Sequence, residues 1–125
     1  MSETPTATAI ADVRLFLTER WRERAAELGR PAPADLAGAC KFAALFAQGL
    51  WGGQVRANFY HTWLETDDGV LDLTEGAGVT LFNPYERDLA FERRPEFRDS
   101  LAACAARVAA WLAEFRSPFD AAGIH

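Results

Sequence analysis

Apolar residues recur at steps of three and four near both ends of the chain, which predicts an amphipathic helix at each end. The first helix is expected over residues 8–28, ending before Gly29. The last helix is expected to begin near Pro95 and to end at Ser117-Pro118, with a loose tail beyond it. The predicted core stripes are Ile10, Val13, Leu17, Trp21, Ala25 and Leu28 in the first helix, and Phe97, Leu101, Cys104, Val108, Trp111, Leu112 and Phe115 in the last.

The middle of the chain begins with a stretch that is apolar on nearly every face. Residues 39–50 read Ala-Cys-Lys-Phe-Ala-Ala-Leu-Phe-Ala-Gln-Gly-Leu. A helix of this composition has no polar side to present to water, so it is predicted to lie in the interior of the domain. Gly49, Gly52 and Gly53 are expected to end this helix and to begin a turn.

Alternation of polar and apolar residues then predicts short strands. Asp67-Asp68-Gly69 is a hairpin signal. A two-residue loop at Asp67-Asp68 would place Trp63 opposite Asp72 and would make His61 a diagonal neighbour of Asp72 on the same face of the sheet. The strands are expected over residues 55–59, 61–66, 70–74 and 79–82.

These elements predict an α+β fold in a single domain over residues 1–125. The cysteine-bearing buried helix would pack on a small antiparallel sheet, and the N- and C-terminal helices would flank both. Residues 85–94 are highly charged and are expected to be irregular, with Leu89 and Phe91 as packing anchors.

Composition narrows the class of protein further. No apolar run approaches the ~20 residues that span a bilayer, and the N-terminus lacks the pattern of a signal peptide, so we expect a soluble, cytoplasmic protein with no membrane partner. The net charge of −5 argues against nucleic acid as a partner. The cysteines, Cys40 and Cys104, are too few for a disulfide framework, and no Cys/His spacing predicts a zinc site. We expect no metal and no cofactor; the sequence leaves the oligomeric state open.

Cys40 is the strongest candidate for chemistry, because it stands at the expected start of the buried helix. The helix dipole and the free N–H groups there favour the thiolate and should lower the pKa of Cys40 below the ~8.5 of a free cysteine. The same N–H groups could form part of an oxyanion hole. The alternative is that Cys40 is a small buried hydrophobic residue, as most free cysteines are.

His61 and Asp72 supply the other groups that cysteine acyl-transfer chemistry needs. An imidazole pairs with the thiolate, and a carboxylate fixes the tautomer of the imidazole. His61 is the only internal histidine, and Asp72 interrupts an apolar run, where aspartate is disfavoured. The alternatives are a histidine bonded to a backbone carbonyl and a carboxylate that caps a turn.

Three other residues have possible roles at the same place. Glu65 falls on the His61 face and could take the carboxylate role, although the two aspartates that follow it suggest an exposed turn. Cys104 lies on the core stripe of the last helix and is expected to be structural. Trp63 is expected in the core, with a place in the wall of a substrate groove as the alternative.

Three short motifs together resemble the transglutaminase-like branch of the papain-like cysteine enzymes. They are Gly38-Ala39-Cys40 leading an apolar helix, Tyr60-His61-Thr62-Trp63-Leu64-Glu65, and Leu71-Asp72-Leu73-Thr74. In that family a Gly-x-Cys helix start is followed by a strand reading His-x-Trp-x-Glu and by another ending Asp-x-Thr. The resemblance covers residues 39–74, and the interval of 21 residues from Cys40 to His61 is short, which implies a compact, bacterial-type member.

The resemblance implies acyl transfer at an amide, as in an amidohydrolase, deamidase, peptidase or transglutaminase. Cys40 would attack the carbonyl carbon, His61 would move the proton and Asp72 would hold His61. The partner would then be a protein, peptide or other amide substrate. Two alternatives stay open: a non-catalytic protein-binding module of the same fold, and an accessory domain whose acidic surface docks a basic protein.

Overall fold

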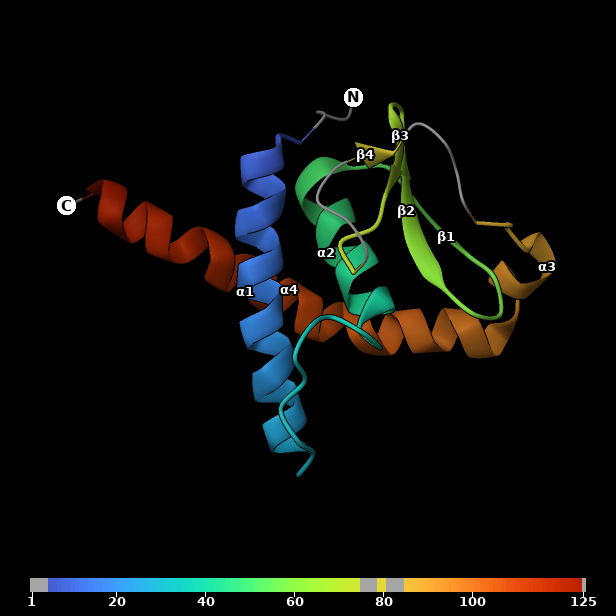
Figure 1. The fold of residues 1–125 in the computed structure, drawn as a ribbon, viewed down its shortest axis with the longest axis horizontal. Coiled ribbons are helices and arrows are strands. Elements are labelled where there is room, and N and C mark those ends of the chain that lie inside the picture. Colours follow the sequence, from blue (N-terminus) through green and yellow to red (C-terminus); the bar gives the residue numbers. More distant parts are fainter. Residues whose placement is uncertain (1–4, 75–78, 81–84, 125) are drawn as a thin grey trace.

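The computed structural model describes residues 5–74, 79–80 and 85–124, and their arrangement confirms the predicted α+β fold. Helices precede and follow a small antiparallel sheet (Figure 1). In chain order the elements are α1 (Ala7–Glu27), α2 (Cys40–Trp51), β1 (Gln54–Ala57), β2 (Thr62–Thr66), β3 (Gly69–Leu71), β4 (Val79–Thr80), α3 (Leu89–Glu92) and α4 (Pro95–Ile124).

The strands form an antiparallel meander in the order β1-β2-β3-β4. Thr66 pairs with Gly69, so the β2–β3 hairpin has the predicted two-residue loop. The pairing of Leu64 with Leu71 continues this register, which places Trp63 opposite Asp72 as the sequence predicted. Gly53 has a positive φ of 97°, and a Cβ there would lie 2.6 Å from the Glu65 carbonyl oxygen; a glycine is therefore required where the chain enters β1.

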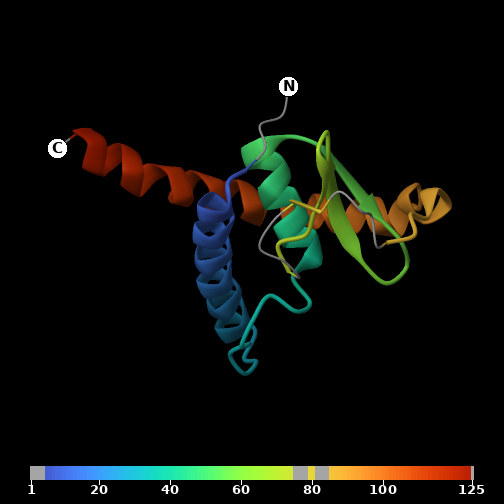
Figure 2. The ribbon, with the colours of Figure 1, turned by 45° about the horizontal axis from the view of Figure 1, so that its top comes forward.

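α2 is the central element, as its apolar composition predicted. It lies between α1 and the sheet in both views, while α4 packs against α2 and extends past α1 (Figures 1 and 2). Phe46 and Ala47 of α2 are fully buried. The core residues are Ile10, Val13 and Leu17 from α1, Leu36 and Ala39 from the connector, Ala43, Phe46 and Ala47 from α2, Leu64, Leu71 and Leu73 from the sheet region, and Val108 and Trp111 from α4.

Aromatic side chains join the three long helices. The Phe42 ring of α2 lies between Trp21 of α1, at 5.5 Å between centroids, and Trp111 of α4, at 5.3 Å. Phe16 of α1 and Phe46 of α2 form a second contact at 5.7 Å. These contacts fix the start of α2 against both flanking helices, which matters because Cys40 is its first residue.

The C-terminal ends of α1 and α4 differ from the predicted ends. α1 ends at Glu27, and Leu28, predicted to end its core stripe, is 47% exposed because it caps the helix outside the contact with α2. α4 does not end at Ser117-Pro118 but continues to Ile124, so the missing N–H of Pro118 interrupts the helix without ending it. The loose tail predicted after Pro118 is helical as far as Ile124, and His125 lies outside the described residues.

The segment after the sheet is more regular than predicted. Residues 89–92 form α3, whose N-cap is Asp88, with its side chain accepting a hydrogen bond from the Phe91 N–H at 2.9 Å. Phe91 packs against Phe97 at 5.0 Å between centroids, as expected of an anchor, but Leu89 is 44% exposed and is not one. Residues 81–82, predicted to continue the last strand, lie outside the described residues.

Within the described residues, no helix is both long enough and apolar enough to cross a membrane.

Candidate active site

Cys40 is the first residue of α2, where the sequence predicted it. Gly38 has a φ of 83°, a left-handed conformation that a side chain would strain, and this bend turns the chain into the helix. A Cβ at position 38 would lie no closer than 3.8 Å to its nearest neighbour, a Trp21 ring carbon, so the role of Gly38 is conformational rather than to admit a close neighbour. Ala39 at the N-cap has no side-chain hydrogen bond to the helix, so the first N–H groups of α2 lack the usual N-cap acceptor.

His61 lies directly before β2, in a turn that Asn58 organises. The Asn58 side-chain oxygen accepts hydrogen bonds from the N–H groups of Tyr60 and His61 at 2.8 and 2.9 Å, and the Asn58 N–H donates to the His61 carbonyl at 3.0 Å. The Asn58 amide also donates to the Glu86 carbonyl at 2.9 Å, which ties this turn to the segment before α3. The backbone of His61 is therefore held on both sides.

Asp72 was predicted to lie within a strand, but it lies just beyond the end of β3, which ends at Leu71. Its Oδ1 accepts hydrogen bonds from the N–H and the hydroxyl of Thr74 at 3.0 and 2.7 Å, which ends the strand in a turn. The side chain is only 9% exposed. The turn-capping alternative is thus part of the structure, but it occupies only one of the two carboxylate oxygens.

The second carboxylate oxygen of Asp72 contacts His61. The His61 Nε2 lies 2.5 Å from Asp72 Oδ2, a hydrogen bond that leaves Nδ1 as the ring nitrogen for another partner. The Cys40 thiol lies close enough to the His61 side chain and to Thr62 for both residues to lower its pKa. The structure therefore brings the three predicted residues together, with the imidazole hydrogen-bonded to the carboxylate and close to the thiol.

The interactions within this cluster favour the charged forms of Cys40, His61 and Asp72. Burial is the largest influence on Cys40 and raises its pKa, but the hydrogen bonds with His61 and Thr62 and the charge of His61 outweigh it, so the pKa of Cys40 falls below its ordinary value. The hydrogen bond with Asp72, followed by that with Cys40, raises the pKa of His61 to about 10. Burial raises the pKa of Asp72, but hydrogen bonds from His61, Tyr85 and Thr74 outweigh it and lower the pKa.

Tyr85 belongs to this cluster, although sequence reasoning missed it. Its hydroxyl donates a hydrogen bond to Asp72 Oδ2, the oxygen that also contacts His61. Its ring lies 4.9 Å from the His61 ring and 4.8 Å from the Trp63 ring, between centroids. Tyr85 therefore covers the His61–Asp72 hydrogen bond and limits its access to water. No periodicity in residues 85–94 indicated this role.

The other three candidate residues, Glu65, Trp63 and Cys104, do not contact His61 or Asp72 through a hydrogen bond among the described residues. Glu65 pairs with Arg56 on β1 at 3.2 Å and not with His61. Trp63 is 1% exposed and lies in the core, so it does not line a groove; its indole N–H is buried without an acceptor among the described residues. Cys104 is half-buried rather than fully buried, and it lines a pocket together with Cys40.

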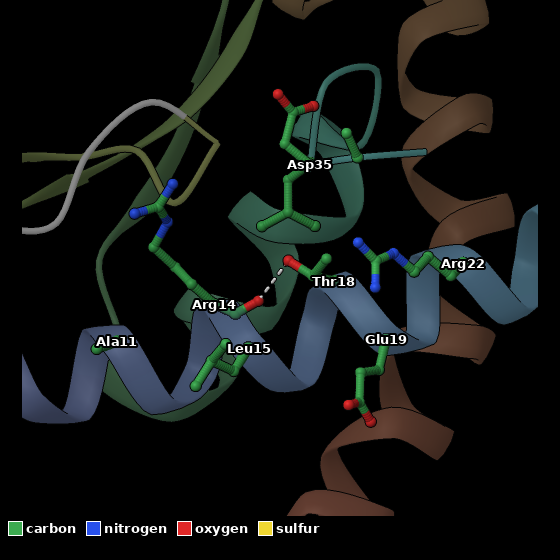
Figure 3. A pocket seen from close by; sticks show the side chains of 9 residues that line it. Ala11, Arg14, Leu15, Thr18, Glu19, Arg22 and Asp35 are labelled. Atoms are coloured by element: carbon green, nitrogen blue, oxygen red, sulfur yellow. Dashed lines mark hydrogen bonds between the residues drawn. The ribbon is translucent and has the colours of Figure 1, made fainter. Parts of the chain in front are cut away.

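Among the hollows lined by described residues, two bear on the site. The smaller, of about 310 Å³, is lined by residues of α1, α2 and α4 and has Cys40 in its wall. The larger, of about 530 Å³, runs along α1 beside residues 34–36 (Figure 3). Its lining contains Arg14, Arg22, Glu19 and Asp35 but no cysteine or histidine, and Arg14 is occupied by the Leu73 carbonyl at 2.9 Å. Of these two hollows, the one beside Cys40 adjoins a candidate nucleophile.

No family model, curated protein or solved structure matches this chain. The functional argument therefore depends on the residues of the site themselves. Among the described residues, no group of three or more His, Cys, Asp and Glu side chains is arranged to hold a metal ion. What the site does contain is a thiol of lowered pKa, an imidazole of raised pKa and a carboxylate that orients the imidazole. This is the set of groups that activates a cysteine as a nucleophile.

Proposed function

We propose that the protein is a cysteine-dependent acyl-transfer enzyme that acts on an amide through Cys40, His61 and Asp72. The observation that carries the proposal is the position of the His61 ring, which is bonded through Nε2 to Asp72 and lies close enough to the Cys40 thiol for each to shift the pKa of the other. A buried histidine with a purely structural role needs one partner, whereas this one connects a nucleophile to a carboxylate. The likeness of the three motifs to transglutaminase-like enzymes supports the same proposal.

In the first half of the reaction the Cys40 thiolate attacks the amide carbonyl carbon. The carbonyl electrons move to oxygen, and the first N–H groups of α2, which carry no side-chain cap, are the donors available to that oxyanion. The C–N bond then breaks, and the leaving nitrogen takes a proton from imidazolium His61. The products of this half are a free amine or ammonia and a thioester on Cys40.

In the second half an acceptor releases the thioester. A water or an amine gives a proton to His61 and attacks the thioester carbonyl, and the C–S bond breaks to return the Cys40 thiolate. Water as acceptor gives hydrolysis or deamidation, and an amine gives transamidation. Asp72 stabilises the imidazolium in both halves, and its hydrogen bond with Nε2 leaves Nδ1 as the ring nitrogen for proton transfer.

An activated acyl donor tests the first half directly. With p-nitrophenyl acetate we expect a stoichiometric burst of p-nitrophenol and an acetyl group on Cys40, identified by peptide mass spectrometry. Adding hydroxylamine during turnover should divert the acyl group to the hydroxamate if an amine can act as acceptor. Turnover of peptide p-nitroanilides would extend the result from an ester to an amide.

Three variants separate catalysis from ordinary thiol chemistry. Cys40→Ala should abolish the burst, and Cys104→Ala should keep it. His61→Gln should slow acylation by about 10²-fold or more, since it removes the acid–base group but leaves the thiol. Acylation of Cys104, or a burst that is equal in Cys40→Ala and the unaltered chain, would show that the proposal is wrong.

One observation favours the second candidate function, a non-catalytic protein-binding module. Phe59 and Tyr60 are 69% and 90% exposed next to His61, and their rings contact each other at 5.5 Å between centroids. Exposed aromatic residues of this kind are enriched at protein interfaces. If binding is the function, Tyr60→Ala should abolish capture of a peptide ligand selected against the protein, and Cys40→Ala should leave capture and its affinity unchanged.

A further inference from the structure

The hollow of about 310 Å³ beside Cys40 has an unusual charge for this protein. Its wall includes Arg24 of α1 and Lys41 of α2 but no aspartate or glutamate. The chain as a whole is acidic, with a net charge of −5. A pocket of positive potential on an acidic protein selects for negative ligands, because the rest of the surface repels them.

Neither cation is neutralised within the pocket. Lys41 forms no ion pair with any residue that the structure describes. Among the described residues, the ion-pair partner of Arg24 is Glu27, at a long 3.7 Å, and Glu27 lies closer to Arg107, at 3.1 Å. The Arg24 guanidinium also lies over the Phe42 ring, 5.9 Å from its centroid, which keeps it beside the pocket wall.

The two charges act at the Cys104 sulfur in the wall of the pocket. Burial is the main influence on Cys104 and raises its pKa, but the charges of Lys41 and Arg24 act in the opposite direction, so both lie close enough to stabilise an anion there. Cys104 and Cys40 line the same hollow. An anionic group bound between the two cations would thus lie beside the candidate nucleophile.

We infer that this pocket binds the acyl donor and selects a small amide substrate that carries a carboxylate near the reacting carbonyl. The inference rests on the proposed function, which supplies the nucleophile. The volume is at the lower end of the range for small-molecule sites, which suits a compound the size of an amino-acid or dipeptide derivative better than a folded protein. Phe42, Ala103 and Gly38 would contact its apolar part, and Arg24 and Lys41 its carboxylate.

A pair of alkylating reagents of nearly equal size measures the selection. Iodoacetate is anionic and iodoacetamide is neutral, and both react with the Cys40 thiolate. The quantity to measure is the ratio of their rate constants at Cys40, followed by peptide mass spectrometry so that Cys104 is scored separately. The reference is the same ratio for N-acetylcysteinamide. A change in the pKa of Cys40 affects both reagents equally and cancels in the ratio.

The ratio at Cys40 should exceed that of the reference thiol. It should fall about threefold to tenfold in Lys41→Gln and in Arg24→Gln, and more in Lys41→Glu, because each change removes or reverses a charge near the reagent. Arg93→Gln, which removes an exposed charge at the end of α3, is the matched control and should leave the ratio unchanged. High salt should reduce the ratio in the unaltered protein.

A ratio equal to that of the reference thiol, or one that Lys41→Gln and Arg24→Gln leave unchanged, would overturn the inference. The proposed function is tested separately by the absolute rate with neutral iodoacetamide, which depends on thiolate activation and not on the pocket charges. As a second measurement, N-acetylglycine should protect Cys40 from iodoacetamide more strongly than its neutral amide does. Equal protection by the two compounds would also contradict selection of a carboxylate.

Discussion

At the scale of single residues, Asp72 combines two roles that looked like alternatives in the sequence. Oδ1 is used by Thr74 to close a turn, and Oδ2 accepts from His61 and from the Tyr85 hydroxyl. The turn fixes the carboxylate in place, so it is already oriented when His61 becomes charged. A side chain held at both oxygens in this way keeps the imidazole in one orientation without reorganisation during the reaction.

Tyr85→Phe tests the role of the tyrosine hydroxyl. The ring that covers His61 is kept, but a carboxylate that is 9% exposed loses a donor, so the free energy of unfolding should fall by about 1–3 kcal/mol. The pKa of the Cys40 thiol should also rise, because a less stabilised carboxylate supports the imidazolium less well. Urea denaturation and the pH dependence of alkylation give the two values.

Tyr60→Phe is the matched control, because Tyr60 is 90% exposed one residue before His61. It should change the unfolding free energy by no more than about 0.5 kcal/mol. Equal effects of the two substitutions would contradict a specific role for the Tyr85 hydroxyl.

The raised pKa of His61 also predicts a pH dependence of stability. The hydrogen bond with Asp72, then that with Cys40, raises this pKa from 6.5 to about 10, so the folded protein keeps a proton that the unfolded chain releases. The stabilisation is complete below pH 6.5 and is lost as the pH rises through about 10. Cys40 has the opposite linkage, because its lowered pKa adds stability above the unfolded value of 9.0 that is lost as the pH falls.

Cys40→Ala removes the opposing linkage and isolates His61. In this variant the free energy of unfolding should decline by about 1–3 kcal/mol between roughly pH 7 and pH 10. This decline is smaller than the full pKa shift of His61 would give, because the His61 side chain is 20% exposed and water screens part of the interaction. The double variant Cys40→Ala, His61→Gln provides the background from all other groups. Parallel pH curves for the two variants would show that His61 does not gain a proton on folding.

At the scale of elements, the contact between α2 and α4 supports the site. Trp111 is 5% exposed and its ring lies 5.3 Å from the Phe42 ring, two residues along α2 from Cys40. Trp111→Ala should therefore cost about 3–5 kcal/mol, measured by denaturant unfolding. Leu15→Ala is the control, because Leu15 is 70% exposed on α1, and it should lower the free energy of unfolding only slightly. A loss below about 1 kcal/mol for Trp111→Ala would mean that this face of α4 contributes little to the core.

Periodicity predicted the helices and the hairpin well, because their apolar residues face one core. The start of α2 at Cys40, the start of α4 at Pro95 and the Thr66–Gly69 closure of the hairpin were all within reach of local pattern. The predictions that failed concern element ends and short elements. The turn at Asp72 shortens β3. The start of α3 depends on one hydrogen bond, which the Asp88 side chain accepts from the Phe91 N–H. Neither the turn nor the N-cap leaves a periodic pattern of apolar residues in the sequence.

At the scale of the whole molecule, four separate segments meet at the site. They are the start of α2, the turn before β2, the turn after β3 and the segment before α3 that carries Tyr85. Cys40 and His61 could be selected from the sequence because the chain has only two cysteines and two histidines, and Asp72 because it interrupts an apolar run. Asn58 and Tyr85 could not, since their importance depends on distances between segments far apart in the chain. The cationic pocket likewise exists only where α1, α2 and α4 converge.

The most direct test of coupling between Cys40, His61 and Asp72 is the rate of Cys40 alkylation by iodoacetamide as a function of pH, compared between the unaltered protein and Asp72→Asn. The unaltered protein should react with a midpoint below that of a free cysteine, because imidazolium His61 stabilises the thiolate. Asp72→Asn removes the main cause of the raised pKa of His61, so the Cys40 midpoint should move to higher pH while near-ultraviolet circular dichroism stays unchanged. Superimposable alkylation curves would contradict the account, because they would mean that Asp72 is not coupled to the thiol.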